Sequence, residues 1–388
     1  MMPPFECQLP RRILFGRGRL AGAGAQVRAR GDRWLLVTGS DPRRADPLQA
    51  VLEQAGAVTT VLTTCGEPTF AAVRAALPTL TAFQPHGVAA LGGGSVIDTA
   101  KVLAMLATNG GDPLDYAEVI GQGRPITHPS LPLIAVPTTA GTGAEATRNA
   151  VLADHERGVK VSLRSPWMVP DGVVLDADLL RDLPAPVMAA TGMDALAQLI
   201  EAFVTRRANP FTDALCRAGI PRAAQALRPA CSSAEADDAR ETLLLAACWS
   251  GIALANAGLG AVHGLAAVLG GSAPAPHGFV CAVLLTPACA INIARLRAAS
   301  PPQPALERYA ELARLLTGRA EADPDEAVAW LHRLTADLPL DRAPLGRMAA
   351  VPEERLIAGA LAASSMKGNP VTLDARDLRA IWQAAVAS

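Results

Sequence analysis

The strongest constraint on the fold is an alternation of strand-like and helix-like segments in the first half of the chain. Short runs rich in Val, Leu and Thr predict strands, and the Ala- and Leu-rich segments between them predict helices. The expected strands are residues 34–38, 58–63, 86–91 and 131–136, and the expected helices are residues 47–55, 71–83 and 96–107. Such alternation is typical of a parallel sheet covered by helices on both faces.

After Leu183 and Pro184 the pattern becomes helical throughout. The expected helices are residues 187–203, 214–227, 234–257, 264–269, 304–316, 324–335, 353–363 and 377–387. A chain of 388 residues is long enough to build two cores. We therefore expect an α/β domain over residues 1–182, an all-helical domain over residues 183–388, and a cleft between them.

Composition and charge argue against several classes of function. The net charge is −1 and no long basic run is present, so nucleic acid is not an expected partner. No apolar run of signal-peptide length precedes Arg12, and none of about 18 residues that would span a membrane follows. The seven cysteines form no CxxC pair, and we interpret each as a reduced core residue. A soluble cytoplasmic protein is expected.

An expected strand leads directly into a glycine-rich turn, Gly92-Gly93-Gly94-Ser95. Glycines let a phosphate approach the backbone closely, and the helix that follows supplies N–H groups and a favourable dipole. Ser95 and Asp98 have the spacing of a capping box. The turn therefore predicts a pyrophosphate cradle formed by Gly93, Gly94, Ser95 and Asp98, with a tight strand-to-helix turn that binds nothing as the alternative.

A second turn, over residues 136–145, also follows an expected strand. Open α/β folds bind ligands at the carboxyl ends of their strands, so Thr138, Thr139 and Thr142 are candidate cofactor contacts. A polar surface loop is the alternative. Lys160 is long enough to reach a phosphate or a ribose, although a lone lysine is more often a solvated charge.

Four residues of the helical half form a candidate metal set. Asp194 and Gln198 lie four apart in an expected helix and so share one of its faces. His263 and His277 are each followed by glycine within apolar sequence. Spacing alone leaves open the alternative that both are buried histidines at helix ends with satisfied hydrogen bonds.

Further motifs follow these in a fixed order along the chain. The series is 92–95 with Asp98 and Lys101, 136–143 with Glu145, 160–164, 191–195, 201–203, 208–213, 263–264, 276–278 and 365–370. In this series the chain resembles the iron-containing, or group III, alcohol dehydrogenase family over nearly its whole length.

The resemblance implies a Rossmann-like N-terminal domain and a helical C-terminal domain, an architecture shared with dehydroquinate synthase. It also implies NAD(P), a divalent metal (Fe²⁺, with Zn²⁺ possible), and a homodimer. The family's metal-ligand positions, which are also its catalytic ones, fall on Asp194, His263 and His277. Its cofactor-contacting positions fall on Gly94, Ser95, Thr138, Thr139, Thr142 and Lys160.

Two departures from the family pattern affect the metal site. Gln198 stands where the family typically has a third histidine ligand, and a carboxamide oxygen is a poorer ligand for Fe²⁺ or Zn²⁺. We expect Gln198 to be a weak fourth ligand at best. Ala267 replaces a histidine that in typical members helps to relay a proton, so the proton needs another route.

A third departure affects the cofactor. NAD-preferring members have an acidic residue after the first strand, where this chain has Gly39 and Ser40, followed by Arg43 and Arg44. The missing carboxylate and the nearby arginines favour NADP(H) mildly, because an arginine is able to pair with a 2′-phosphate. The alternative is that both arginines point into solvent.

We therefore expect a metal-dependent alcohol dehydrogenase, or aldehyde reductase, that transfers a hydride between an alcohol and NAD(P). The metal is expected to act as a Lewis acid toward the substrate oxygen. One alternative is a metal-independent reductase resembling maleylacetate reductase. Another is a catalytically silent nucleotide-binding protein. The small-molecule substrate and the physiological direction of the reaction are left open by the sequence.

Overall fold

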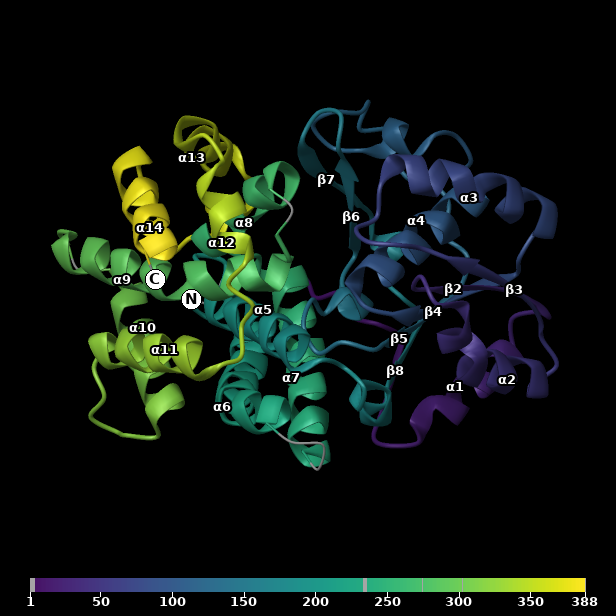
Figure 1. Cartoon of the computed structure of the whole chain (residues 1–388), viewed down its shortest axis with the longest axis horizontal. Helices are drawn as coiled ribbons and strands as arrows, with labels where there is room; N and C mark the ends of the chain where they lie inside the picture. Colours follow the sequence, from purple (N-terminus) through teal and green to yellow (C-terminus); the bar gives the residue numbers. More distant parts are fainter. Residues whose placement is uncertain (1–3, 233–235, 274, 302, 388) are drawn as a thin grey trace. The chain divides into compact units, whose positions relative to one another are not determined.

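The computed structural model describes residues 4–232, 236–273, 275–301 and 303–387. The described chain forms two compact units. The sheet unit consists of Gln8–Thr139 and Gly143–Asp182. The helical unit consists of the chain from Leu183 onward, the short segment Ala140–Thr142 and the described residues up to Cys7. Figure 1 labels the α-helices and most of the strands of both units.

The sheet unit is built on six parallel strands. In spatial order they are β1 (Arg12–Phe15), β8 (Gly172–Leu175), β5 (Leu133–Pro137), β4 (Gly87–Gly92), β2 (Arg33–Thr38) and β3 (Val58–Thr63). Every neighbouring pair in this order is parallel. The carboxyl ends of all strands therefore meet at one edge, where ligands bind in open α/β folds.

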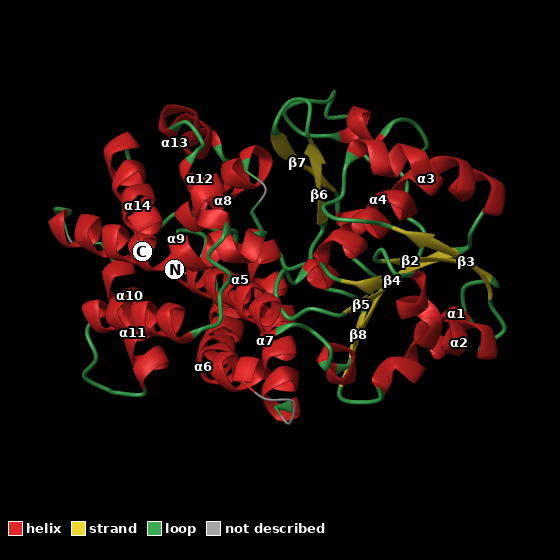
Figure 2. Cartoon of the chain, viewed as in Figure 1, coloured by secondary structure: helices red, strands yellow, loops and turns green. Residues whose placement is uncertain are grey.

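Both faces of this sheet are covered, as the sequence predicted. Alternate residues of the strands point to opposite faces, so Leu35 and Val37 belong to one core cluster while Trp34 and Leu36 belong to another. Helices α3 (Phe70–Phe83) and α4 (Gly94–Asn109) supply the first cluster, and α1 (Ala23–Val27) and α2 (Asp46–Gln54) supply the second. Figure 2 shows the strands between these helices.

A separate antiparallel hairpin consists of β6 (Asn149–Asp154) and β7 (Val159–Arg164). Its buried side chains, including Leu152 and Leu163, pack in the same core cluster as α3 and α4. The hairpin brings Lys160 close to the loop that follows β3.

The helical unit contains ten α-helices among its described residues. They are α5 (Ala185–Val204), α6 (Pro210–Ser232), α7 (Asp237–Ala257), α8 (Ala261–Ser272), α9 (His277–Ala298), α10 (Ala305–Thr317), α11 (Pro324–Asp337), α12 (Pro344–Ala349), α13 (Glu353–Ala362) and α14 (Ala375–Ala387). Helix α5 is central and packs against α6, α7 and α9. The α/β-plus-helical fold class expected from the sequence is confirmed.

The predicted elements agree with the structure except where the pattern is weak. All four predicted strands and all the predicted helices exist, with ends that shift by up to several residues. The predicted start of the helix over 234–257 lies outside the described residues, which resume at 236. Strands β1, β6, β7 and β8 and the long helix α9 were not predicted.

Two described helices, α5 and α9, are long and apolar enough to cross a membrane by length and composition alone, and the bent pair α7 and α8 meets the same test. Neither helix is an uninterrupted apolar run, because α5 carries Asp194, Gln198 and Glu201, and α9 carries Thr286, Pro287 and Asn292. Most of their apolar stretches are buried inside the molecule. We interpret both as core helices of the helical unit.

Candidate metal centre and nucleotide site

The glycine-rich turn connects β4 to α4 at the carboxyl edge of the sheet. Helix α4 begins at Gly94, and Gly93 is its N-cap with extended backbone (φ −76°, ψ −173°). The first N–H groups of a helix have no intrahelical acceptors, and together with the helix dipole they favour an anion at this end. The position fits the predicted pyrophosphate cradle.

The predicted capping box at this turn is wrong. The N-cap is Gly93, which has no side chain, so no side-chain cap exists. Because the helix starts two residues earlier than a Ser95 cap requires, Ser95 lies inside the first turn. Asp98 instead accepts a hydrogen bond of 3.0 Å from the backbone N–H of Val151 in β6.

The threonine-rich turn lies directly beside the glycine turn. The backbone N–H of Thr138 donates to the carbonyl of Gly92 at 3.0 Å. A Cβ atom added to Gly93 would lie 3.3 Å from Cγ2 of Thr139, so a side chain at residue 93 would crowd the second turn. Thr138 and Thr139 therefore share the edge of the predicted cradle.

Thr142 belongs to the helical unit. Its carbonyl accepts a hydrogen bond of 3.3 Å from the side-chain amide of Gln198. A Cβ atom on Gly141 would lie 2.6 Å from Cβ of Thr191 in α5, so this segment passes close to α5. The structure thus places the backbone of Thr142 beside the metal-site helix, while its predicted cofactor contact stays a prediction.

The remaining predicted cofactor residues lie at the ends of other strands. Gly39 and Ser40 directly follow β2. Behind them the exposed guanidinium of Arg43 pairs with Asp41, with Nη2 3.0 Å from Oδ2. The ammonium group of Lys160 is ion-paired with Glu67. Both basic side chains therefore already have an acidic partner.

A buried cluster of charged residues stabilises the helix that follows the glycine-rich turn. The Lys101 ammonium donates to Oγ1 of Thr147 at 2.7 Å and to the carbonyl of Asn149 at 2.9 Å. Burial raises the pKa of Asp98 to about 6 and that of Glu145 to about 7, in both cases against an opposing effect of Lys101. Burial also lowers the pKa of Lys101 to about 8. This cluster fixes α4 against β6 and explains why Asp98 is not at the helix cap.

Three predicted metal ligands meet in the helical unit. Asp194 comes from α5, His263 from α8 and His277 from the first residue of α9. Oδ1 of Asp194 lies 3.2 Å from Nε2 of His263 and 3.8 Å from Nε2 of His277. Two nitrogen or oxygen donors on one tetrahedral cation, each at about 2.0–2.1 Å from it, lie about 3.3 Å apart. The distance from Asp194 to His263 matches this value and that to His277 is about 0.5 Å longer, so all three donors lie within reach of a common cation.

The orientation of His263 is fixed by two polar side chains at the start of α8. The N–H of Ala261 donates to Oδ1 of Asn369 at 3.1 Å, and the N–H of Val262 donates to Oε1 of Glu201 at 2.8 Å. Nδ1 of His263 lies 2.6 Å from Oε2 of Glu201. This leaves Nε2 facing Asp194, as in the carboxylate–histidine–metal arrangement of many metalloproteins.

The three ligands are electrostatically coupled. Burial alone would raise the pKa of Asp194, but His277 and His263 outweigh it and leave the pKa below its usual value. Burial would lower the pKa of both histidines, yet the neighbouring Cys281 and Asp194 raise it. Buried groups that stabilise one another's charge in this way are typical of functional sites.

Gln198 lies beside the cluster on the same face of α5 as Asp194, as its spacing predicted. Its amide nitrogen is 3.1 Å from Oδ1 of Asp194 and also faces the Thr142 carbonyl, while its oxygen accepts a hydrogen bond of 2.7 Å from Ser250. Since two acceptors surround one end of the amide, the nitrogen must occupy that end. This arrangement weighs against the predicted coordination by the Gln198 oxygen, which stays a prediction.

Cys281 is a member of the cluster that is not predicted from the sequence. Its thiol and the donor atoms of Asp194, His263 and His277 all lie within 4.8 Å of one another. The signal that would have found it is its spacing of four residues from His277, which puts both on one face of α9. Ala267, the departure at the family's proton-relay position, is exposed on α8 and offers no polar group.

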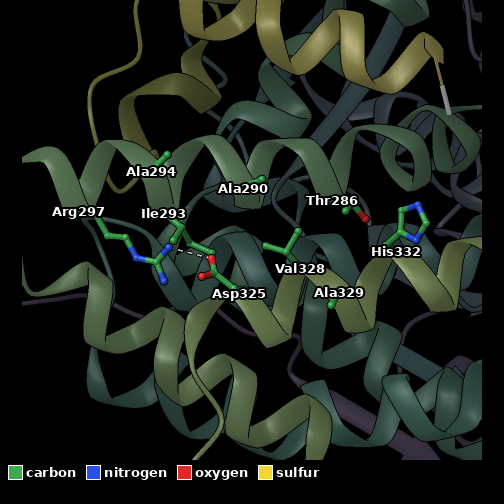
Figure 3. Close-up of a pocket in the computed structure, with 9 residues that line it drawn as sticks. All are labelled: Thr286, Ala290, Ile293, Ala294, Arg297, Asp325, Val328, Ala329 and His332. Atoms are coloured by element: carbon green, nitrogen blue, oxygen red, sulfur yellow. Dashed lines mark hydrogen bonds and ion pairs between the residues drawn. The ribbon is translucent and has the colours of Figure 1, made fainter.

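A surface groove of about 390 Å³ lies elsewhere in the helical unit, between α9 and α11 (Figure 3). An ion pair between Arg297 and Asp325 lies at one end, and Thr286 and His332 lie at the other. None of the predicted site residues lines this groove.

Comparison with known proteins matches both units of the chain to one enzyme family. A family model described as "Iron-containing alcohol dehydrogenase" matches residues 10–177, and one described as "Fe-containing alcohol dehydrogenase family, C-terminal" matches residues 188–386. The chain is 36% identical over 335 residues to "Probable alcohol dehydrogenase EutG" of Salmonella typhimurium, covering 85% of this chain and 81% of that protein.

Two solved structures are similar to the whole chain. The crystal structure of a 1,3-propanediol oxidoreductase has a TM-score of 0.90 and 30% identity, covering 99% of this chain and 100% of that one. The structure of sulfoacetaldehyde reductase from Bifidobacterium kashiwanohense in complex with NAD⁺ has a TM-score of 0.86 and 26% identity, covering 100% of both chains.

Proposed function

Because the chain belongs to the iron-containing alcohol dehydrogenase family and is thereby a metal-dependent alcohol dehydrogenase, we propose that Asp194, His263 and His277 hold its catalytic cation. The reaction is reversible hydride transfer between a small alcohol and NAD(P). The observation that carries the proposal is the convergence of these three donor atoms, from three different helices, within 4.8 Å.

The residues of the helical unit have separate tasks in this reaction. When bound, a divalent cation supplies Lewis acidity toward the substrate oxygen, and NAD(P) supplies or accepts the hydride. Asp194 and His263 are almost fully buried and fix the position of the cation, whereas the side chain of His277 is 34% exposed. The open side of the site is therefore at His277, where substrate is able to approach.

The sheet unit provides the cofactor site. We assign the pyrophosphate to the start of α4, where Gly93, Gly94 and Ser95 offer backbone N–H groups, with Thr138 and Thr139 beside it. The relative complexed with NAD⁺ supports a nicotinamide cofactor. We retain the mild preference for NADP(H), since no carboxylate stands at Gly39 or Ser40 and Arg43 is exposed.

Several finer properties belong to the same proposal. Fe²⁺ is the first candidate for the cation and Zn²⁺ the second. We also propose a cytoplasmic homodimer that acts on small alcohols and aldehydes. 1,3-Propanediol and sulfoacetaldehyde, named in two similar proteins, are the first substrates to test.

Metal analysis tests the proposal directly. We expect purified enzyme to contain one divalent cation per chain, to lose activity on chelation, and to regain it when Fe²⁺ or Zn²⁺ is added. Asp194→Ala should fail to regain activity. Full turnover after chelation, together with wild-type turnover in Asp194→Ala, would establish a metal-independent reductase. Tight NAD(P)H binding with no turnover of any alcohol or aldehyde would establish a silent nucleotide-binding protein.

A further inference from the structure

The cluster contains a fourth donor that the proposed function does not use. Cys281 is completely buried on α9, one helical turn after His277. Its Sγ lies 3.7 Å from Nε2 of His263 and 3.6 Å from Nε2 of His277. Six other cysteines occur in the chain, and among the described residues Cys281 alone belongs to a potential metal cluster.

These distances match a coordination sphere. On a tetrahedral cation with metal–nitrogen bonds of about 2.0–2.1 Å and a metal–sulfur bond of about 2.3 Å, a nitrogen and a sulfur ligand lie about 3.6 Å apart. Both measured sulfur–nitrogen distances agree with this value within about 0.1 Å. The three helices therefore hold two imidazoles, one carboxylate and one thiol close enough together to share one cation.

The hydrogen bonds of Gln198 leave the fourth corner to the thiol. The Gln198 nitrogen faces Asp194, and its oxygen is engaged by Ser250. Coordination by the oxygen would require the amide to turn over, which would put that oxygen against the Asp194 carboxylate and the Thr142 carbonyl. That orientation would give up the two hydrogen bonds of the Gln198 nitrogen and the one that its oxygen accepts from Ser250, whereas coordination by the thiol requires no such loss.

We propose that Cys281, as a thiolate, is the fourth protein ligand of the cation, and that Gln198 is a positioning residue that orients Asp194. The inference rests on the metal site of the proposed function but not on its redox reaction. A thiolate with two imidazoles and one carboxylate favours Zn²⁺ or Co²⁺ over Mg²⁺ and Mn²⁺, and the substrate would join as a fifth ligand from the exposed side of His277.

Cobalt spectroscopy of the full-length protein tests the ligand set without an activity assay. A thiolate bound to Co²⁺ produces an intense near-ultraviolet charge-transfer band, which imidazole and carboxylate ligands do not. We expect this band in the wild-type protein and in Cys289→Ala, a matched control that removes another buried thiol from α9. The band should disappear in both Cys281→Ala and Cys281→Ser.

Affinity separates a ligand from an outer-sphere partner. Loss of a residue that only orients a ligand lowers metal affinity by about 10- to 100-fold. We expect Cys281→Ala to lower Co²⁺ affinity, measured by competition with a chelator, by more than this range. Gln198→Ala should keep the band and stay within the range.

The outcomes distinguish this inference from the proposed function. A wild-type cobalt protein without the band overturns the assignment of Cys281 whatever the variants do, even if the enzyme is active. A band that persists in Cys281→Ala overturns it too. The band together with no turnover of any alcohol or aldehyde would support Cys281 and contradict the proposed function, and a wild-type chain that binds no cobalt contradicts both.

Discussion

Nδ1 of His263 lies 2.6 Å from Oε2 of Glu201, and the other oxygen of the same carboxylate accepts the N–H of Val262. One buried glutamate therefore fixes both the start of α8 and the ring that this helix presents to the cation. Because the Nδ1–H donates to this carboxylate, Nε2 is the nitrogen that binds a cation once its own proton is displaced.

We expect Glu201→Gln to weaken metal binding by about 10- to 100-fold. An amide has only one acceptor oxygen, so it is unable to serve both the Val262 N–H and the protonated Nδ1. Zn²⁺ affinity measured against a competing chelator checks the prediction, with the exposed Glu354→Gln as control. An unchanged affinity in Glu201→Gln would show that α8 positions His263 without the carboxylate.

A second prediction concerns Lys160, whose ammonium is paired with Glu67. If Lys160 contacts a cofactor phosphate or ribose, Lys160→Ala should raise the KM for the cofactor by about 10-fold or more, the cost of losing a hydrogen bond to a charged group. Glu67→Gln removes the competing partner and should leave this KM unchanged or lower it. Equal increases in this KM in both variants would mean that the ion pair between Lys160 and Glu67 only stabilises the β6–β7 hairpin.

The sequence predicts those metal-site residues that lie on a recognisable helix or within a family motif. Asp194 and Gln198 were placed on one helix face, because α5 is long and begins after a proline. Helix α9 was missed because its residues are apolar nearly all round and Pro287 interrupts the run, so no 3.6-residue period marks it. Without that helix, the relation between His277 and Cys281 is invisible in the sequence.

In the sheet unit, too, some features have no signal in the local sequence. Strand β8 has only four residues and directly follows Pro170 and Asp171, so its local pattern is that of a turn. The capping box predicted at Ser95 is wrong because the spacing of Ser95 and Asp98 carries no information about the contact that Asp98 makes with β6. Long-range contacts, such as that of Asp98 with Val151, decide these cases.

A third prediction concerns the cofactor's 2′-phosphate. Arg43 is paired with Asp41 at an exposed position, and exposed ion pairs contribute only about 0–1 kcal/mol, so a phosphate is able to replace the carboxylate. We expect Arg43→Ala to lower kcat/KM for NADPH by about 10-fold while leaving NADH nearly unchanged. Asp41→Asn keeps an acceptor for the Arg43 N–H. It should raise the ratio of kcat/KM for NADPH to kcat/KM for NADH. The assignment of Arg43 to the 2′-phosphate would be refuted if the wild-type enzyme preferred NADH and neither variant changed the ratio of the two kcat/KM values.

The last prediction concerns the buried carboxyl of Glu145, which is 2% exposed and faces Lys101. Burial raises its pKa from 4.5 to about 7, more than Lys101 lowers it. Between these pH values the folded chain holds a proton that the unfolded chain has released, so the contribution of Glu145 to stability falls as pH rises. Asp98, with its pKa raised to about 6, acts in the same direction. Lys101 acts in the opposite direction, but only between about pH 8 and 10.5.

Glu145→Gln removes this titration, since a carboxamide stays neutral at every pH. The free energy of unfolding of the variant, relative to that of the wild type, should therefore increase from about pH 5 to about pH 7, as measured by urea denaturation at fixed ionic strength. Glu354→Gln, at an exposed site, should show a constant difference over this range. If the difference for Glu145→Gln is instead constant from pH 5 to pH 7 and decreases with rising pH only below about pH 5, Glu145 is ionised in the folded protein and Lys101 stabilises its charge by more than burial costs, because a lowered pKa acts only below the unfolded value of 4.5.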